Sequence, residues 1–207
     1  MPTLRASDGG LLGYRDLGSG DDVVVLVHGW MVSGRVWDYL APHVERGRRL
    51  IVPDLRGVGA SREAPPDLEL ERLGRDVAEI VEHAGPRRVH VVGHSMGGQV
   101  ALVAAALVGA KLRSLALLTP VPPDGLPLPP EVAASFRASG GSRDAQGGIL
   151  DSACKALPVE ARGSLLDDAL TIDPEVIAAG FDVWTRGGVR ARLAEIANPT
   201  MVLATDD

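Results

Sequence analysis

Five short hydrophobic runs in the chain have the pattern of β-strands. The run 23–27 (VVVLV) is aliphatic at every position, as expected for a strand buried on both faces of a parallel sheet. The other runs are 49–53, 88–92, 112–118 and 199–204. Between the second and third runs, apolar residues from Leu70 to Ala84 recur at helical steps of three and four. This alternation predicts an α/β fold whose mostly parallel sheet carries helices on both faces.

Three further segments complete the predicted core. Two weak extended stretches, near Leu4 and at 11–17, are separated by the turn sequence SDGG and predict a hairpin at the edge of the sheet. Residues 96–108 are apolar almost all round, which predicts a buried helix. A third helix is expected at 191–197.

The character of the chain changes at residue 120. The sequence VPPDGLPLPP breaks regular structure, and the following residues have the pattern of short helices interrupted by SGGSRDAQGG. We therefore expect a core formed by residues 1–119, a helical insertion at 120–188, and a return to the core at 189–207.

Composition excludes several classes of protein. The 207 residues are 45% hydrophobic and 23% charged, which is typical of a globular domain. The single cysteine, Cys154, excludes an internal disulfide and a cysteine-ligated zinc site, and it fits a reducing compartment. A net charge of -6 without a basic stripe argues against nucleic acid as a partner. No secretory signal and no membrane-spanning stretch are evident, so we expect a cytoplasmic protein with no membrane partner.

The strongest chemical signal is the sequence Gly93-His94-Ser95-Met96-Gly97. It follows a predicted strand and precedes a predicted helix, the context in which a GxSxG serine is held in a strained turn with its hydroxyl exposed. The N-terminus of the helix would favour negative charge at the same place. The motif lacks the lysine of a P-loop and the glycine pattern of a Rossmann turn. We interpret Ser95 as a nucleophile; the alternative is an incidental serine in a glycine-rich turn.

A second signal, His28-Gly29-Trp30, follows the first buried strand. The oxyanion of a tetrahedral intermediate needs two fixed donors, and the backbone N–H groups of Trp30 and Met96 are the natural pair. His28 could be a general base. We favour a structural role in which His28, with Gly29, supports the oxyanion loop by hydrogen bonding.

A third motif, DLRGVGAS at 54–61, follows the next strand. Together with HGW and GHSMGG, in this order and at these strand ends, it resembles the α/β-hydrolase superfamily, specifically its esterase, lactonase and C–C hydrolase branch. The resemblance spans the whole chain and implies a helical cap at 120–188. It also implies a serine hydrolase with nucleophile, acid and histidine in that order along the chain, and with no metal or organic cofactor.

The resemblance places the acid near the end of the sequence. In this family it commonly lies three positions beyond a small residue that ends a strand, which points to Asp207 after Ala204. Asp206 is the alternative if the alignment slips by one residue. Asp124 is a weaker candidate, because its place beside Gly125 is also typical of a turn.

The same resemblance implies a catalytic histidine after the acid, following a last strand. None of the five histidines is a convincing substitute; they are His28, His43, His83, His90 and His94. We therefore expect the last strand, the terminal helix and the histidine to belong to a longer chain, in preference to a naturally base-less protein. The 207 residues alone should be nearly inactive.

The substrate pocket should lie beneath the insertion. Apolar and aromatic residues that could line it, or pack in the core instead, are Trp30, His94, Met96, Phe136, Phe181 and Trp184. We expect hydrolysis of a small-molecule ester or similar carbonyl compound through an acyl-enzyme on Ser95. The alternatives are a non-catalytic binding protein, or a C–C hydrolase, lyase or haloperoxidase-like enzyme on the same fold. The sequence does not determine the oligomeric state.

Overall fold

The structure is a computed structural model that describes residues 1–44 and 47–205. The strands are β1 Thr3–Arg5, β2 Leu11–Leu17, β3 Asp22–Val27, β4 Arg49–Pro53, β5 Arg88–His94, β6 Leu112–Leu118 and β7 Thr200–Leu203. The helices are α1 Ala41–Val44, α2 Leu70–Ala84, α3 Met96–Val108, α4 Pro130–Arg137, α5 Arg143–Ala153, α6 Val159–Ala169 and α7 Pro174–Arg186.

These strands form one sheet in the order β1-β2-β4-β3-β5-β6-β7. Strands β4, β3, β5, β6 and β7 run parallel to one another. β1 and β2 form an antiparallel hairpin at one edge, and β2 pairs antiparallel with β4. The predicted α/β class, parallel sheet and hairpin are therefore confirmed. Because parallel strands share one direction, their carboxyl ends, which carry the three sequence motifs, meet at one edge.

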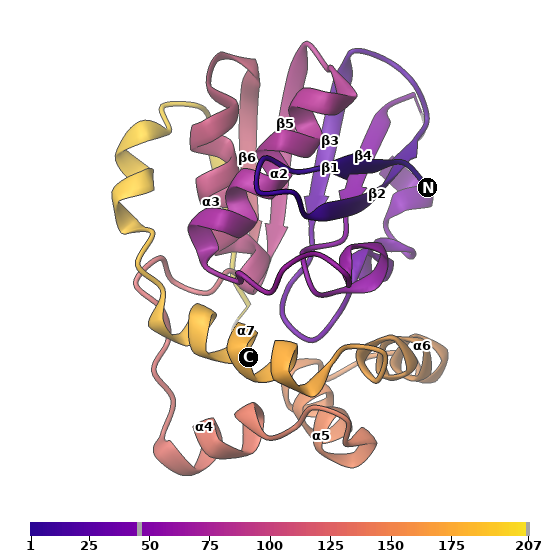
Figure 1. Cartoon of the computed structure of the whole chain (residues 1–207), viewed down its shortest axis with the longest axis vertical. Helices are drawn as coiled ribbons and strands as arrows, with labels where there is room; N and C mark the ends of the chain where they lie inside the picture. The colour runs from indigo at the N-terminus through magenta and orange to yellow at the C-terminus, as the bar shows by residue number, and fades with distance from the viewer. Residues whose placement is uncertain (45–46, 206–207) are drawn as a thin grey trace.

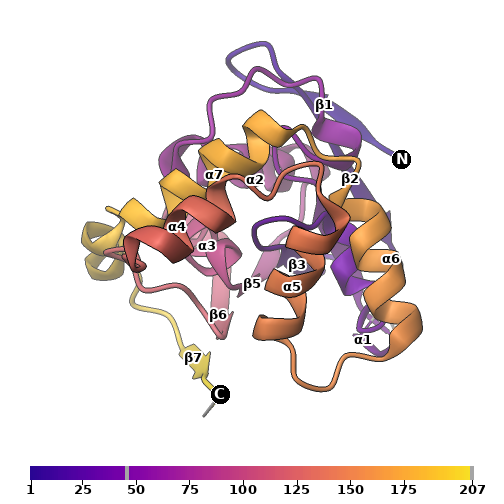
Figure 2. The same ribbon diagram turned by 90° about the horizontal axis from the view of Figure 1, so that it is seen from below.

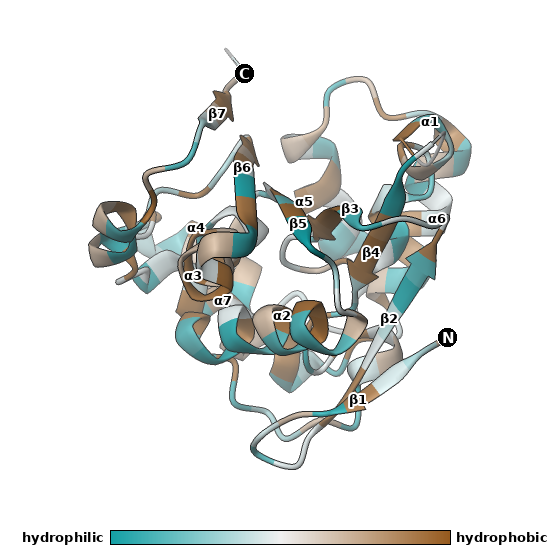
Figure 3. Ribbon diagram, turned by 90° about the horizontal axis from the view of Figure 1, so that it is seen from above, coloured by the Kyte–Doolittle hydropathy of each residue, from teal (hydrophilic) through white to brown (hydrophobic). Residues whose placement is uncertain are grey.

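Helices cover the sheet unequally. α2 and α3 pack on one face, where Leu73, Val77 and Val100 join the main core. A smaller cluster on the other face includes Leu26 and Trp37 and lies beside the short helix α1. Figure 3 shows α2 and α3 on one side of the strands and α1 on the other. α3 is buried along most of its length, as its uniformly apolar sequence predicts.

Helices α4–α7 lie together below the carboxyl ends of the strands (Figures 1 and 2). These helices occupy the predicted insertion. The interruption between them that was expected at SGGSRDAQGG is shorter than predicted. The residues RDAQGG begin α5, because the Ser142 hydroxyl caps its N-terminus by accepting the Ala145 N–H at 3.3 Å. The predicted helix at 191–197 is also wrong: residues 190–195 form a short 3₁₀-helix.

Strand β7 pairs with β6 and is exposed along its length. The side chains of Met201, Val202 and Leu203 are each more than half exposed. Within the described ranges, no helix is long and apolar enough to cross a membrane.

Candidate active site

Ser95 occupies the sharp turn between β5 and α3. Its backbone has φ 56° and ψ −125°, a left-handed conformation that is strained for a residue with a side chain. The adjacent glycines make this turn possible. A Cβ atom on Gly93 would lie 2.3 Å from the Gly97 carbonyl oxygen, and one on Gly97 would lie 2.3 Å from the His28 carbonyl oxygen. The turn therefore packs directly against the loop that begins at His28.

Backbone strain is concentrated at one cavity. In the described part of the chain, three residues other than glycine have positive φ: Met31, Ser95 and Thr119. All three line a single cavity of about 480 Å³ that lies between the strand ends and helices α4–α7. Strained residues persist only where their surroundings hold them, and they cluster at functional sites.

Of the predicted pocket residues, Trp30, His94, Phe136 and Trp184 line the Ser95 cavity. Phe181 does not. It points into the core and contacts Trp30 and Trp184, with ring centroids 5.9 and 5.1 Å away, because α7 turns this position toward the sheet. The pocket also contains aliphatic residues of α5 and α6 that the sequence analysis did not name, including Ile149, Leu150 and Leu165.

Trp30 connects the loop after β3 to helix α7. Its indole N–H donates to the Ile177 carbonyl oxygen at 2.8 Å, and its ring stacks on Phe136 with an interplanar angle of 8°. The backbone N–H groups of Trp30 and Met96 donate to no acceptor among residues 1–44 and 47–205. Trp30 lines the Ser95 cavity, and Met96 is the first residue of α3, directly after Ser95.

Gly29 brings this loop close to the nucleophile. A Cβ atom on Gly29 would lie 3.1 Å from the Ser95 Cβ and 3.5 Å from His94 Nδ1. The loop and the turn are therefore close together, and a side chain at position 29 would press on Ser95 and on the His94 carbonyl oxygen. The contact explains why glycine follows His28.

His28 is fully enclosed and has a partner for each ring nitrogen. The Leu55 N–H donates to Nε2 at 2.9 Å, so Nε2 is unprotonated, and Nδ1–H donates to the Gly29 carbonyl oxygen at 2.8 Å. Burial lowers the pKa of His28, which keeps the ring neutral. No nitrogen is left to accept a proton from Ser95. The geometry thus agrees with a structural role for His28.

Ser95 Oγ has no hydrogen-bond partner within the described ranges. His94 lines the same cavity, and its Nδ1 is buried without a hydrogen bond. Burial lowers the pKa of His94, with a smaller contribution from nearby His28. His43 and His83 are exposed and do not line the cavity. Asp206 and Asp207 lie outside the described residues.

Asp124, the weaker candidate for the acid, is exposed and does not line the Ser95 cavity. Its carboxylate accepts the Arg190 Nε–H at 2.6 Å. This hydrogen bond lowers the pKa of Asp124. Its position is that of a surface ion pair next to a turn.

A different serine and histidine are hydrogen-bonded at the opposite end of β5. His90 Nδ1 lies 2.8 Å from Ser114 Oγ, and its Nε2 lies 3.1 Å from Asp22 Oδ1. The three residues come from adjacent strands of the sheet. Ser114 has neither the strained backbone nor the helix N-terminus that Ser95 has. We therefore assign the candidate active site to Ser95.

The sequence analysis missed two carboxylates that position the site. Asp54 accepts the backbone N–H groups of Gly34 and Ala60 at 2.8 and 2.9 Å. Asp168 of α6 accepts the Ser33 N–H at 2.9 Å and thereby joins the helical segment to the loop after Trp30. Asp54 stands in the recognised DLRG motif, whereas nothing in the local sequence marks Asp168.

Arg56 of the DLRG motif is structural. Its guanidinium is wholly buried and pairs with Asp76 at 2.7 Å and Asp8 at 2.8 Å. These carboxylates raise the pKa of Arg56. Within the described residues, no cluster of three or more histidine, cysteine, aspartate or glutamate side chains could hold a metal ion.

Comparison with known proteins identifies the family. Residues 22–172 match the model of the alpha/beta hydrolase fold family. The chain therefore belongs to the α/β-hydrolase family, and it resembles enzymes of that type. The chain spans about half the length of the curated relatives it matches.

Named relatives differ in their activities. A non-heme haloperoxidase of Rhodococcus erythropolis is 37% identical over 66% of this chain and 53% of its own. A pimeloyl-[acyl-carrier protein] methyl ester esterase of Nitrosomonas europaea is 36% identical over 51% of this chain and 39% of its own. The structure of an esterase from Exiguobacterium antarcticum superposes with a TM-score of 0.83 at 20% identity, over 97% of this chain and 79% of its own. That last likeness concerns the fold alone.

Proposed function

We propose that this chain belongs to a serine hydrolase that acts on small-molecule carboxylic esters through an acyl-enzyme on Ser95. The observation that carries the proposal is the strained backbone of Ser95, which lies at the N-terminus of α3 and lines a cavity of about 480 Å³. A relative named as a methyl ester esterase supports the choice of substrate class.

In this mechanism Ser95 Oγ attacks the ester carbonyl carbon and passes its proton to a base. The Trp30 and Met96 N–H groups stabilise the oxyanion that forms, and the positive end of the α3 dipole adds to this stabilisation. Expulsion of the alcohol leaves the acyl-enzyme, which water then hydrolyses. We assign Asp207 the role of orienting a histidine base. No described histidine contacts Ser95 Oγ.

Residues 120–188 act as a cap over the core formed by residues 1–119 and 189–207 in this proposal. Supporting contacts are those of Trp30 with Ile177 and of Ser33 with Asp168, which hold α7 and α6 over the Ser95 cavity. Residues of the cap would then select the substrate, and residues of the core would perform the reaction.

A second candidate is peroxide-dependent halide oxidation, because the relative from Rhodococcus erythropolis is named a haloperoxidase. Turnover of a panel of short esters, measured beside peroxide-dependent bromination of a dye, distinguishes the two reactions. With imidazole in the buffer to supply the base, we expect ester hydrolysis that falls to background in Ser95→Ala. Bromination without ester hydrolysis would favour the second candidate, and ester hydrolysis that survives in Ser95→Ala would contradict both.

A further inference from the structure

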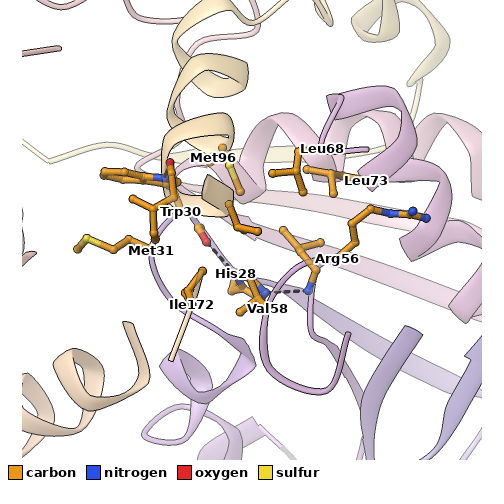
Figure 4. A pocket seen from close by; sticks show the side chains of 14 residues that line it. His28, Trp30, Met31, Arg56, Val58, Leu68, Leu73, Met96 and Ile172 are labelled. Carbon is orange, nitrogen blue, oxygen red and sulfur yellow. Dashed lines mark hydrogen bonds between the residues drawn. The ribbon is translucent and has the colours of Figure 1, made fainter. Parts of the chain in front are cut away.

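A second, smaller cavity lies behind the loop that carries Trp30 (Figure 4). It has a volume of about 30 Å³. Its walls come from the HGW loop, the DLRG loop, α2 and α7, with Met96 of the Ser95 turn at one side. Gly29, Trp30 and Met31 line both this cavity and the cavity of Ser95, so only this short segment separates the two.

No polar side chain in the small cavity is free to bind a ligand. The two polar side chains among its lining residues are His28 and Arg56. Both ring nitrogens of His28 already have partners. The guanidinium of Arg56 is paired with Asp76 and points away from the cavity in Figure 4. Because a buried water needs several polar partners, this cavity favours an apolar occupant.

The size of the cavity limits the shape of that occupant. A volume of about 30 Å³ accommodates roughly two water-sized groups. This is room for the last carbons of an unbranched alkyl chain and too little for a ring. A carbonyl at Ser95 and an alkyl end behind Trp30 would place the two ends of one linear molecule in the two cavities.

The partition between the cavities contains a side chain that can move. Met31 lines both cavities, and methionine is unbranched and changes rotamer at low energetic cost. Its backbone is also held at φ 65°. On the far side, Leu68, Ile172 and Val176 separate the small cavity from a groove on the outer surface between α7 and the loop at 57–68.

We propose that the small cavity binds the end of a linear hydrocarbon chain whose carbonyl group lies at Ser95. The chain passes beside Met31, and the wall formed by Leu68, Ile172 and Val176 sets its maximum length. This inference deepens the proposed function and rests on it for the position of the carbonyl. It adds a substrate class: esters with an unbranched acyl chain.

Binding of straight-chain 2-alkanones of five to twelve carbons, measured by calorimetry, tests the inference without requiring hydrolysis. These ketones have a carbonyl group but no leaving group. Each buried methylene should strengthen binding about fourfold until the chain reaches the wall. Ile172→Phe fills the small cavity, so the longest ketone accepted by the wild type should bind about fifteenfold more weakly, the effect of two methylenes.

Two further variants make the result specific. Leu170→Phe is the matched control, because Leu170 lines the outer groove but neither of the inner cavities. It should leave the chain-length limit unchanged. Leu68→Ala thins the wall and should let the gain per methylene continue beyond the wild-type limit, which tests the inference even if Ile172→Phe does not fold.

The same chain-length limit in the wild type, Ile172→Phe and Leu68→Ala would overturn the inference, and so would a failure of every ketone to bind. The proposed function is judged separately by ester hydrolysis that depends on Ser95. Hydrolysis with an unchanged limit would reject only the small cavity as a binding site. A shifted limit without hydrolysis in buffer containing imidazole would reject only the esterase proposal.

Discussion

The Leu55 N–H donates a hydrogen bond to Nε2 of His28 at 2.9 Å. This bond joins the DLRG loop after β4 to the HGW loop after β3, and it requires a neutral imidazole. His28 is 1% exposed, so its protonation inside the fold would break the bond from Leu55 and bury a charge, a cost that outweighs the attraction of nearby Asp54 and Asp168.

Stability should therefore decrease at acidic pH. Burial lowers the pKa of both His28 and His94 below 6.5, so the unfolded state takes up protons near pH 6.5 that the folded state does not. Stability from these groups is present above pH 6.5 and is lost as the pH falls, by up to about 1.4 kcal/mol per pH unit for each histidine. Denaturant unfolding between pH 7.5 and 5.5 measures this dependence.

The variant His28→Gln should have a shallower pH dependence than the wild type over the same interval. His43→Gln, at an exposed position of α1, is the control and should keep the wild-type slope. An equal slope in the wild type and His28→Gln would contradict the assignment of His28 as a buried neutral group.

A methyl group at Gly97 should strongly destabilise the fold. Its Cβ would lie 2.3 Å from the His28 carbonyl oxygen and 2.6 Å from that of Val27, and both are backbone atoms that cannot rotate away. We expect Gly97→Ala to lower the free energy of unfolding by about 3 kcal/mol or to prevent folding. Gly163→Ala in α6 meets no atom within 4 Å and should stabilise by about 0.5–1 kcal/mol. Similar stabilities of the two variants would be inconsistent with close packing at the Ser95 turn.

Alanine substitutions of two adjacent aspartates in α6 should differ sharply in their effect on the free energy of unfolding. Asp168→Ala leaves the buried Ser33 N–H without its acceptor and should lower the free energy of unfolding by about 1–3 kcal/mol. Asp167 forms an exposed ion pair with Arg143, so Asp167→Ala should change the free energy of unfolding by less than about 0.5 kcal/mol. Denaturant titration compares them, and limited proteolysis within α6 should be faster in Asp168→Ala alone. Equal stability and equal proteolysis of the two variants would show that Asp168 does not hold α6 in place.

The elements that the sequence predicted best are those whose periodicity is strong. The helix at 96–108 was located by its apolar sequence and its glycine-rich start, and the structure has the same bounds. The helix expected at 191–197 was wrong, because a few apolar positions do not distinguish an α-helix from a 3₁₀ turn.

Contacts between distant segments could not be predicted in the same way. The partner of His28 is 27 residues away and depends on how β3 and β4 pair, and the partner of Ser33 is 135 residues away in α6. Whether Phe181 or Trp184 lines the cavity depends on the rotation of α7 about its axis. Composition and spacing do not fix that rotation.

The most direct test of the account is covalent labelling of Ser95 by a fluorophosphonate, measured by intact mass in buffer containing imidazole so that a missing base does not limit the reaction. We predict one adduct in the wild type and none in Ser95→Ala. Ser114→Ala removes the serine that is bonded to His90 and should still be labelled. An unlabelled wild type, or an adduct retained in Ser95→Ala, would contradict the assignment of Ser95 as the nucleophile.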